Sequence, residues 1–262
     1  MMILEADRLS ISFGGVRAIN GVNIAIESGQ VFSIIGPNGS GKTTLFNLVS
    51  GIYTPNSGSI RFAGETVTGL APDQLARRGL SRTFQNLQIF SRMSVLENVM
   101  VGRHRHERTG IFADLLHWPS VARQNKATGE AARAALARVD LADSADRPAA
   151  SLAYGALKRL EIARALASEP ILLLLDEPAA GCNPVETQDI DRVIRTIAKD
   201  GITVVLVEHD MRLVMNISDR VHVLASGRTL AEGTPKQVRS NTDVIEAYLG
   251  VHGSQEAARA FD

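Results

Sequence analysis

Residues 31–44 read VFSIIGPNGSGKTT. The first five, Val31–Ile35, are apolar at nearly every position, which is typical of a parallel strand covered on both faces. The next eight fit the pattern G-x-x-x-x-G-K-[ST], and a helical run from Thr44 to Ser50 follows them. Strand, glycine-rich turn and helix in this order predict a phosphate-binding loop in an α/β core.

The residues of this loop suit a nucleoside triphosphate with Mg²⁺. Glycines let backbone N–H groups curl around phosphate oxygens, and the helix N-terminus adds positive potential. Lys42 would neutralise the β- and γ-phosphates, and the Thr43 hydroxyl would ligate Mg²⁺. The predicted nucleotide contacts are Gly36, Pro37, Asn38, Gly39, Ser40, Gly41, Lys42, Thr43 and Thr44.

Two more apolar runs, Ile171–Leu175 and Thr203–Val207, predict further parallel strands. Ligands of open parallel sheets bind beyond the carboxyl ends of the strands, so the residues after these runs are candidates for chemistry. Asp176 would lie near the metal, and Glu177 would polarise an attacking water. His209 would donate to the γ-phosphate or to that water.

Gln85, in the stretch Arg82-Thr83-Phe84-Gln85, carries an amide that would reach Mg²⁺ or the attacking water from the start of a helical region. The remaining histidines have no supporting context, and we assign them structural roles. They are His104, His106, His117, His222 and His252.

A second anion-binding position is predicted ahead of the helix Leu157–Ser168. The small residues of Ser151–Gly155 precede that helix, whose N-terminus attracts anions. Lys158 and Arg159 stand near this positive end, so either they are solvated or an external anion offsets the repulsion. A phosphate cradle and a separate anion-seeking helix end in one chain indicate two subunits that complete each other's sites.

The predicted fold class is α/β, with a P-loop NTPase core and a mostly parallel sheet. An N-terminal antiparallel β subdomain is expected over residues 4–26, and residues 57–62 predict another short strand. An inserted α-helical subdomain is broken at Pro119 and Pro148. A short strand after Gly227 and a helix to about Tyr248 complete the fold. We predict one domain over residues 1–250, with a core of 1–85 and 165–226, a helical part of about 86–164, a C-terminal part of 227–250 and a frayed tail of 251–262.

Composition narrows the function classes. The 262 residues are 45% hydrophobic and 21% charged, which excludes a disordered or fibrous protein. The 28 Lys+Arg balance 28 Asp+Glu, which argues against broad nucleic-acid binding. The lone Cys182 excludes an intramolecular disulfide. We expect no secretion signal and no membrane helix, hence a soluble cytoplasmic protein that meets the membrane through a partner.

Taken together, these motifs resemble the ATP-binding subunits of ABC transporters over about residues 4–250. Gly36–Thr44 resembles Walker A, Ile171–Glu177 Walker B, and Leu152–Ala156 falls at the signature motif. The resemblance implies that Phe13 stacks on adenine, that Gln85 is the Q-loop glutamine and ligates Mg²⁺ with Thr43 and Asp176, and that His209 is the switch histidine. It also implies that Ala153, Tyr154 and Gly155 contact the nucleotide of a second ATPase subunit.

The chain is further similar to the subgroup that serves branched-chain amino acid importers. The supporting stretches are 82–85, 110–123, 152–155, 159–164, 176–181, 208–211 and 243–250. This similarity implies a peripheral ATPase on the cytoplasmic face of the inner membrane, with permease subunits, a second ATPase subunit and, indirectly, an extracytoplasmic binding protein. A permease helix would dock near residues 85–98. Selectivity lies in the permease and the binding protein, so the transported molecule is implied by the resemblance alone.

The chain departs from the general family pattern at four motif positions. Ala153 lacks the usual serine hydroxyl, and Ala156 replaces a polar residue. Asn183 stands where the D-loop has Asp, and Cys182 stands where it usually has Leu. These leave turnover at the site completed by this signature open. Two rival functions also stay open: an ATPase for lipid or lipopolysaccharide export, and an ABC module in translation or DNA repair. A plain P-loop kinase does not explain the Leu152–Gly155 helix end.

Overall fold

The apolar run at the start of the phosphate loop lies inside a six-stranded sheet of order β10-β9-β3-β8-β7-β6. We describe a computed structural model, which covers residues 1–83, 87–104 and 119–248. The strands are β3 (Val31–Ile35), β6 (Leu80–Arg82), β7 (Leu172–Asp176), β8 (Thr203–Val207), β9 (Arg220–Ala225) and β10 (Arg228–Gly233). All neighbouring pairs are parallel except β9 with β10. Every residue of β3, β7 and β8 is buried, as the unbroken apolar runs predict.

A second, antiparallel sheet of order β2-β1-β4-β5 lies beside the first. Its strands are β1 (Met2–Phe13), β2 (Val16–Glu27), β4 (Ser57–Phe62) and β5 (Glu65–Thr66), followed by α2 (Pro72–Arg77). Phe46 and Leu45 of α1 (Lys42–Val49) share one buried cluster with Leu4 of β1 and Phe32 of β3. The helix that begins at the phosphate loop is therefore fixed by apolar packing to both sheets.

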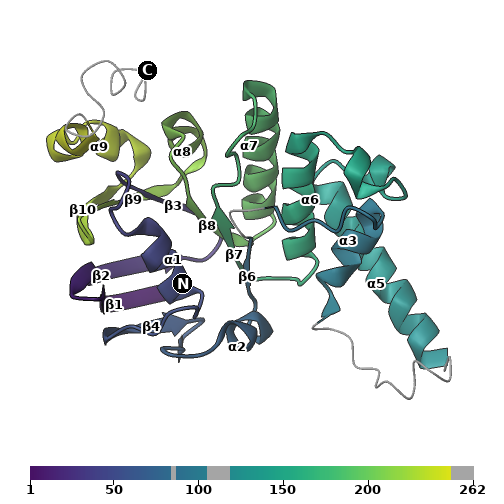
Figure 1. Cartoon of the computed structure of the whole chain (residues 1–262), viewed down its shortest axis with the longest axis horizontal. Helices are drawn as coiled ribbons and strands as arrows, with labels where there is room; N and C mark the ends of the chain where they lie inside the picture. The colour runs from purple at the N-terminus through teal and green to yellow at the C-terminus, as the bar shows by residue number, and fades with distance from the viewer. Residues whose placement is uncertain (84–86, 105–118, 249–262) are drawn as a thin grey trace.

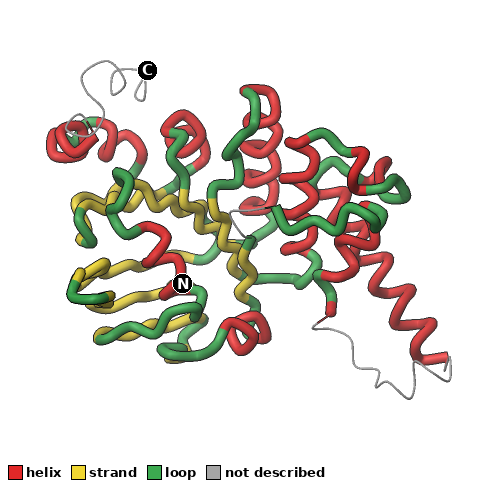
Figure 2. Tube along the Cα trace, in the orientation of Figure 1, coloured by secondary structure: helices red, strands yellow, loops and turns green. Residues whose placement is uncertain are grey.

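Helices gather at the opposite end of the molecule from the antiparallel sheet (Figure 1). They are α3 (Val95–Val101), α5 (Pro119–Arg138) and α6 (Tyr154–Leu166), with short 3-10 turns at Ala142–Ser144 and Ala149–Ser151. The tube in Figure 2 shows how α7 (Pro184–Lys199) stands between this helical group and the strands. Two smaller helices, α8 (Met211–Ile217) and α9 (Pro235–Arg239), follow β8 and β10.

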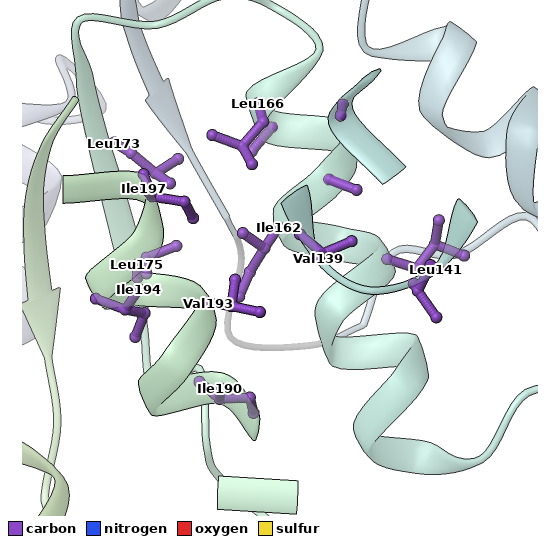
Figure 3. Close-up of a cluster of buried hydrophobic side chains, with 14 of the residues drawn as sticks. Val139, Leu141, Ile162, Leu166, Leu173, Leu175, Ile190, Val193, Ile194 and Ile197 are labelled. Atoms are coloured by element: carbon purple, nitrogen blue, oxygen red, sulfur yellow. The ribbon is translucent and has the colours of Figure 1, made fainter. Parts of the chain in front are cut away.

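One buried cluster joins the helical group to the sheet (Figure 3). Ile190, Val193, Ile194 and Ile197 are buried on one face of α7, in the same cluster as Leu173 and Leu175 of β7 and Ile162 and Leu166 of α6. Burying such side chains contributes roughly 1.5–3 kcal/mol each, so this cluster holds α6 and α7 against β7.

The predicted fold class is confirmed, with several corrections to the elements. The helix predicted from Leu157 begins three residues earlier, at Tyr154, and Pro119 begins α5 rather than breaking it, since proline fits a first helical turn. The single helix predicted to end at Tyr248 is two, α9 and residues 242–248. Strands β6 and β9 were not predicted. Within the described residues, no helix combines the length and the apolar character that a membrane crossing needs.

Candidate functional site

A cleft of about 500 Å³ opens at the phosphate loop. It is lined by Val16, Arg17, Ala18, Asn38, Gly39, Ser40, Gly41, Lys42, Thr43, Thr44, Glu177, Ser226 and Gly227. Seven of the nine predicted nucleotide contacts in the loop, residues 38–44, therefore meet Glu177 in one cleft. Val16, Arg17, Ser226 and Gly227 were missed from the sequence, because turns of two other strand pairs bring them here.

Two physical reasons favour glycine in the loop: a Cβ would clash with neighbouring backbone, and the backbone dihedral angle φ is positive. A Cβ at Gly36 would lie 2.2 Å from the Leu224 carbonyl oxygen, and one at Gly41 would lie 2.7 Å from that of Ala18. Gly41 caps α1 at φ +105°, a left-handed conformation that favours glycine. Ser40 carries a buried hydroxyl oxygen without a hydrogen-bond partner. A loop pressed this closely against its neighbours, with an unsatisfied polar atom, fits a phosphate ligand.

Lys42 has its ammonium group turned back onto the loop. Its Nζ donates to the carbonyl oxygens of Gly36, at 2.7 Å, and Pro37, at 3.0 Å. Burial lowers the pKa of this ammonium group, and the negative charge of Glu177 opposes that shift. A half-buried cation that donates to neutral carbonyls is suited to receive a phosphate oxygen in their place.

Asp176, the last residue of β7, is held by an arginine that the sequence did not single out. Arg82 Nη2 lies 3.0 Å from Asp176 Oδ2, with side-chain exposures of 11% and 6%. The same guanidinium donates to Asn47 Oδ1 and Ser50 Oγ and lies over the Phe46 ring. Burial raises the pKa of the Asp176 carboxyl, while the hydrogen bond and charge of Arg82 oppose the rise.

The residues around Asp176 fit a magnesium ion. A threonine hydroxyl and a carboxylate are the hard oxygen ligands that Mg²⁺ takes, together with nucleotide phosphates and water. Across the residues that the structure describes, no three His, Cys, Asp or Glu side chains gather as a metal cage. A magnesium ion would thus be held by Thr43, Asp176 and the nucleotide. Gln85, the third predicted ligand, lies outside the described residues.

Glu177 and His209 approach each other at the ends of β7 and β8. His209 Nδ1 lies 3.9 Å from Glu177 Oε1, which is too long for a hydrogen bond but leaves both groups facing one position. Glu177 has a left-handed φ of +47°, and its N–H donates to the Val207 carbonyl of β8. The two predicted catalytic side chains are therefore brought together by neighbouring parallel strands.

The predicted second anion position lies at the N-terminus of α6, and none of Ala153, Tyr154 and Gly155 lines the cleft. The Gly155 N–H donates to Glu186 Oε1 at 2.9 Å, and Tyr154 Oη donates to the Ala180 carbonyl at 3.2 Å. The backbone N–H groups of Asn183 and Gly155 lower the pKa of Glu186. A carboxylate of the same chain thus occupies part of this helix end.

Lys158 is not solvated, contrary to the first of the two expectations for it. Its side chain belongs to a residue only 3% exposed, and its Nζ lies 3.5 Å from the Glu177 carbonyl oxygen. Arg159 donates to the Val139 carbonyl. The helical period of residues 157–168 did not indicate that α7 and the loop after β7 cover this charged position.

Phe13 does not line the cleft. Its ring is 44% exposed and packs edge-on against Tyr53, with centroids 5.2 Å apart. Val16, three residues later, is the lining residue from this hairpin. A role for Phe13 in adenine stacking therefore stays a prediction.

Comparisons with known proteins point to one family over 95% of the chain. A family model described as ABC transporter matches residues 19–180, and one for branched-chain amino acid ATP-binding cassette transporters matches residues 228–254. The chain is 49% identical to the high-affinity branched-chain amino acid transport ATP-binding protein BraF of Pseudomonas aeruginosa and 45% identical to LivG of Escherichia coli K12, covering 95% of this chain and 98% of each relative.

A solved structure supports the same relationship. The ADP conformation of an ATP-binding cassette of an ABC transporter superposes with a TM-score of 0.84, at 34% identity, over 95% of this chain and 99% of the other. The similarity therefore includes the phosphate loop, both sheets and the helical group.

Proposed function

The chain belongs to the ABC transporter family of ATP-binding proteins, and from this premise we propose that it hydrolyses ATP to drive import of branched-chain amino acids through a membrane permease. The family model matched at residues 228–254 supports this cargo over lipid or lipopolysaccharide, since that model describes branched-chain amino acid transporters. Nothing in the described residues favours a role in translation or DNA repair.

The observation that carries the catalytic proposal is the meeting of Lys42 and Glu177 in one cleft. Lys42 exchanges its loop carbonyls for phosphate oxygens, and residues 36–44 bind the triphosphate through backbone N–H groups. Thr43 and Asp176 would hold Mg²⁺, which would supply positive charge beside the bound triphosphate. Glu177 accepts a proton from the attacking water, and His209 and Gln85 orient that water.

A second ATPase subunit completes the site. None of Ala153, Tyr154 and Gly155 lines the cleft of its own chain, so the anion that they bind belongs to a partner's nucleotide. Closure then brings the partner's α6 N-terminus to the γ-phosphate, and hydrolysis removes the contacts that hold the two subunits together. The partner is either a copy of this chain or a related subunit.

A groove of about 340 Å³ is suited to transmit this motion to the permease. It lies between β6 and the helices α3 and α6, and its lining includes Arg82, Phe90 and Val101. Phe90 and Val101 are exposed apolar side chains. We propose that a cytoplasmic permease helix docks here, beside residues 85–98, and that the ATPase is peripheral on the cytoplasmic face of the membrane. An extracytoplasmic binding protein would deliver the amino acid.

Glu177→Gln tests the catalytic assignment. The amide keeps the shape but cannot accept the proton, so we expect ATP hydrolysis to fall about 100-fold or more while ATP binding persists. The variant should accumulate as an ATP-bound dimer in size-exclusion chromatography. Glu130→Gln, on the exposed face of α5, is the matched control and should hydrolyse at the wild-type rate. Wild-type turnover in Glu177→Gln would contradict the role of this carboxylate.

The transport proposal has its own test. The tagged full chain is pulled down from detergent-solubilised native membranes, and the co-purifying proteins are identified by mass spectrometry. Hydrophobic permease subunits with a second ATPase subunit are expected, and leucine uptake into reconstituted vesicles should require ATP. Recovery of ribosomes or DNA instead would reject the transport reading and leave the ATPase chemistry standing.

A further inference from the structure

Glu208 is a buried carboxylate for which the proposed mechanism has no use. It stands between β8 and His209, and its side chain is fully enclosed. A buried charge needs hydrogen-bond partners, because desolvation of an unpaired carboxylate is unfavourable by several kcal/mol. Its partners therefore indicate what the residue is for.

These partners are backbone N–H groups from two separate loops. Glu208 Oε1 accepts from Ala179 N at 2.9 Å, in the loop that follows Glu177. Glu208 Oε2 accepts from His209 N at 3.1 Å and Asp210 N at 3.4 Å. Burial raises the pKa of Glu208, and these N–H groups oppose the rise. One carboxylate thus ties the peptide after the catalytic glutamate to the peptide of the catalytic histidine.

The same carboxylate also flanks the histidine ring. Glu208 Oε2 lies 3.8 Å from His209 Nδ1, and Glu177 Oε1 lies 3.9 Å from the same nitrogen. The imidazole is otherwise exposed, with 63% of the side chain open to solvent.

We propose that Glu208 is a positioning residue for ATP hydrolysis, which holds His209 at a fixed distance from Glu177 by joining the Ala179 and His209 backbones. This inference rests on the proposed role of His209. It does not require Glu208 to touch nucleotide or water. A residue that acts only through His209 has no effect once His209 is gone, whereas a residue needed for folding alone keeps its effect.

The test is a double-mutant cycle on the purified full chain: Glu208→Gln, His209→Ala and both together. Glutamine keeps the size of Glu208 but offers one acceptor oxygen, so its NH₂ group must face one of the two loops. We expect Glu208→Gln to lower kcat about tenfold through misplacement of His209, with KM for ATP unchanged. His209→Ala should lower kcat about 100-fold, and the double variant should match His209→Ala.

Each alternative result has a distinct meaning. A double variant whose loss of kcat is the product of the two single losses overturns the inference, and so does a wild-type kcat in Glu208→Gln. A wild-type kcat in His209→Ala instead refutes the proposed role of His209, which distinguishes the two failures. If Glu208→Gln does not fold, Glu208→Asp serves the same cycle, because its shorter carboxylate cannot reach both loops.

A matched control separates stability from positioning. Glu232 is another carboxylate paired with a histidine, 2.9 Å from the buried His222 Nδ1, but it lies on β10 away from the cleft. Glu232→Gln should lower the melting temperature and leave kcat within about twofold of wild type. A drop in kcat for Glu232→Gln equal to that of Glu208→Gln would show that any lost carboxylate acts through the fold, and would overturn the inference.

Discussion

The carboxyl edge of the central sheet and the N-terminus of α6 are the two regions that we propose bind phosphate, and they differ in how much of the site this chain supplies. At the sheet edge, the cleft joins Lys42 to Glu177, and Arg82 holds Asp176 in place. At α6, the Gly155 N–H donates to Glu186 of the same chain, and the neighbouring Tyr154 is 43% exposed.

The difference indicates which part of the ATP site this chain forms by itself and which part depends on the proposed partner subunit. Short strands buried on both faces fix the sheet edge before any ligand arrives, which is the preorganisation that catalysis needs. The α6 end lies on a separate helical group, where Glu186 accepts a hydrogen bond from the Gly155 N–H. In the proposed mechanism, another subunit's nucleotide takes the place of this carboxylate. Variants at the sheet edge and at α6 test whether the two regions act separately.

Arg82→Met should destabilise the folded chain at the sheet edge. The change leaves Asp176 as a buried, unpaired carboxylate, so we expect the free energy of unfolding to fall by about 3–5 kcal/mol. Urea unfolding followed by circular dichroism measures it. Arg133→Met removes an exposed ion pair with Asp146 and should lower it by at most about 1 kcal/mol. Equal losses in the two variants would mean that the Arg82 pair is no more than a surface contact.

Lys42→Met should weaken the binding of phosphate groups at the sheet edge. Loss of a charged hydrogen-bond donor to phosphate should weaken ATP binding by the isolated chain about 100-fold. Titration with a fluorescent ATP analogue measures the dissociation constant. Lys126→Met, on the exposed part of α5, is the control and should bind as the wild type does. Unchanged binding in Lys42→Met would show that the backbone of the loop suffices.

Gly155→Ala should separate the two regions. A Cβ there would lie 2.5 Å from Glu186 Cγ, so the α6 end must shift while the cleft stays intact. We expect ATP binding by the isolated chain within about twofold of wild type and steady-state hydrolysis about tenfold lower, since a displaced donor costs less than a removed one. Gly129→Ala in α5 has open space for its Cβ and should hydrolyse normally. Weakened ATP binding in Gly155→Ala would mean that the regions are not independent.

Phe13→Ala should give the smallest effect. If the exposed ring stacks on adenine, its loss weakens ATP binding about fivefold, in line with roughly 1 kcal/mol for an aromatic pair. Inorganic tripolyphosphate has no base, so its competition for the cleft should be unchanged. Equal weakening for ATP and tripolyphosphate would assign Phe13 to packing against Tyr53 alone.

Prediction from the sequence was most accurate where a single apolar run defines a strand. Val31–Ile35 and Thr203–Val207 were predicted to the residue, because five apolar residues in a row have few alternatives when turns bound them. The same logic predicted Glu177 and His209 at one edge, since parallel strands present their carboxyl ends together. Predicting those residues needed the order of strands and turns, but no side-chain contact.

Long-range partners could not be predicted in this way. The contact between Glu208 and Ala179 spans 29 residues, and that between Arg82 and Asp176 spans 94. Lys158 is of a residue type that is usually exposed, yet it is only 3% exposed and its Nζ lies 3.5 Å from the Glu177 carbonyl oxygen in the loop after β7. A single sequence carries no record of which distant backbone N–H groups converge on a carboxylate.

The backbone at Glu177 has a consequence for evolvability. A φ of +47° disfavours any residue with a Cβ by about 1–2 kcal/mol, so glycine is the residue that the local conformation itself prefers. Glu177→Gly would then relieve strain and remove the proposed base in a single substitution. At this position, stability favours glycine and activity favours glutamate. A selection for thermostable variants that ignores turnover would therefore favour a protein that binds nucleotide without hydrolysing it.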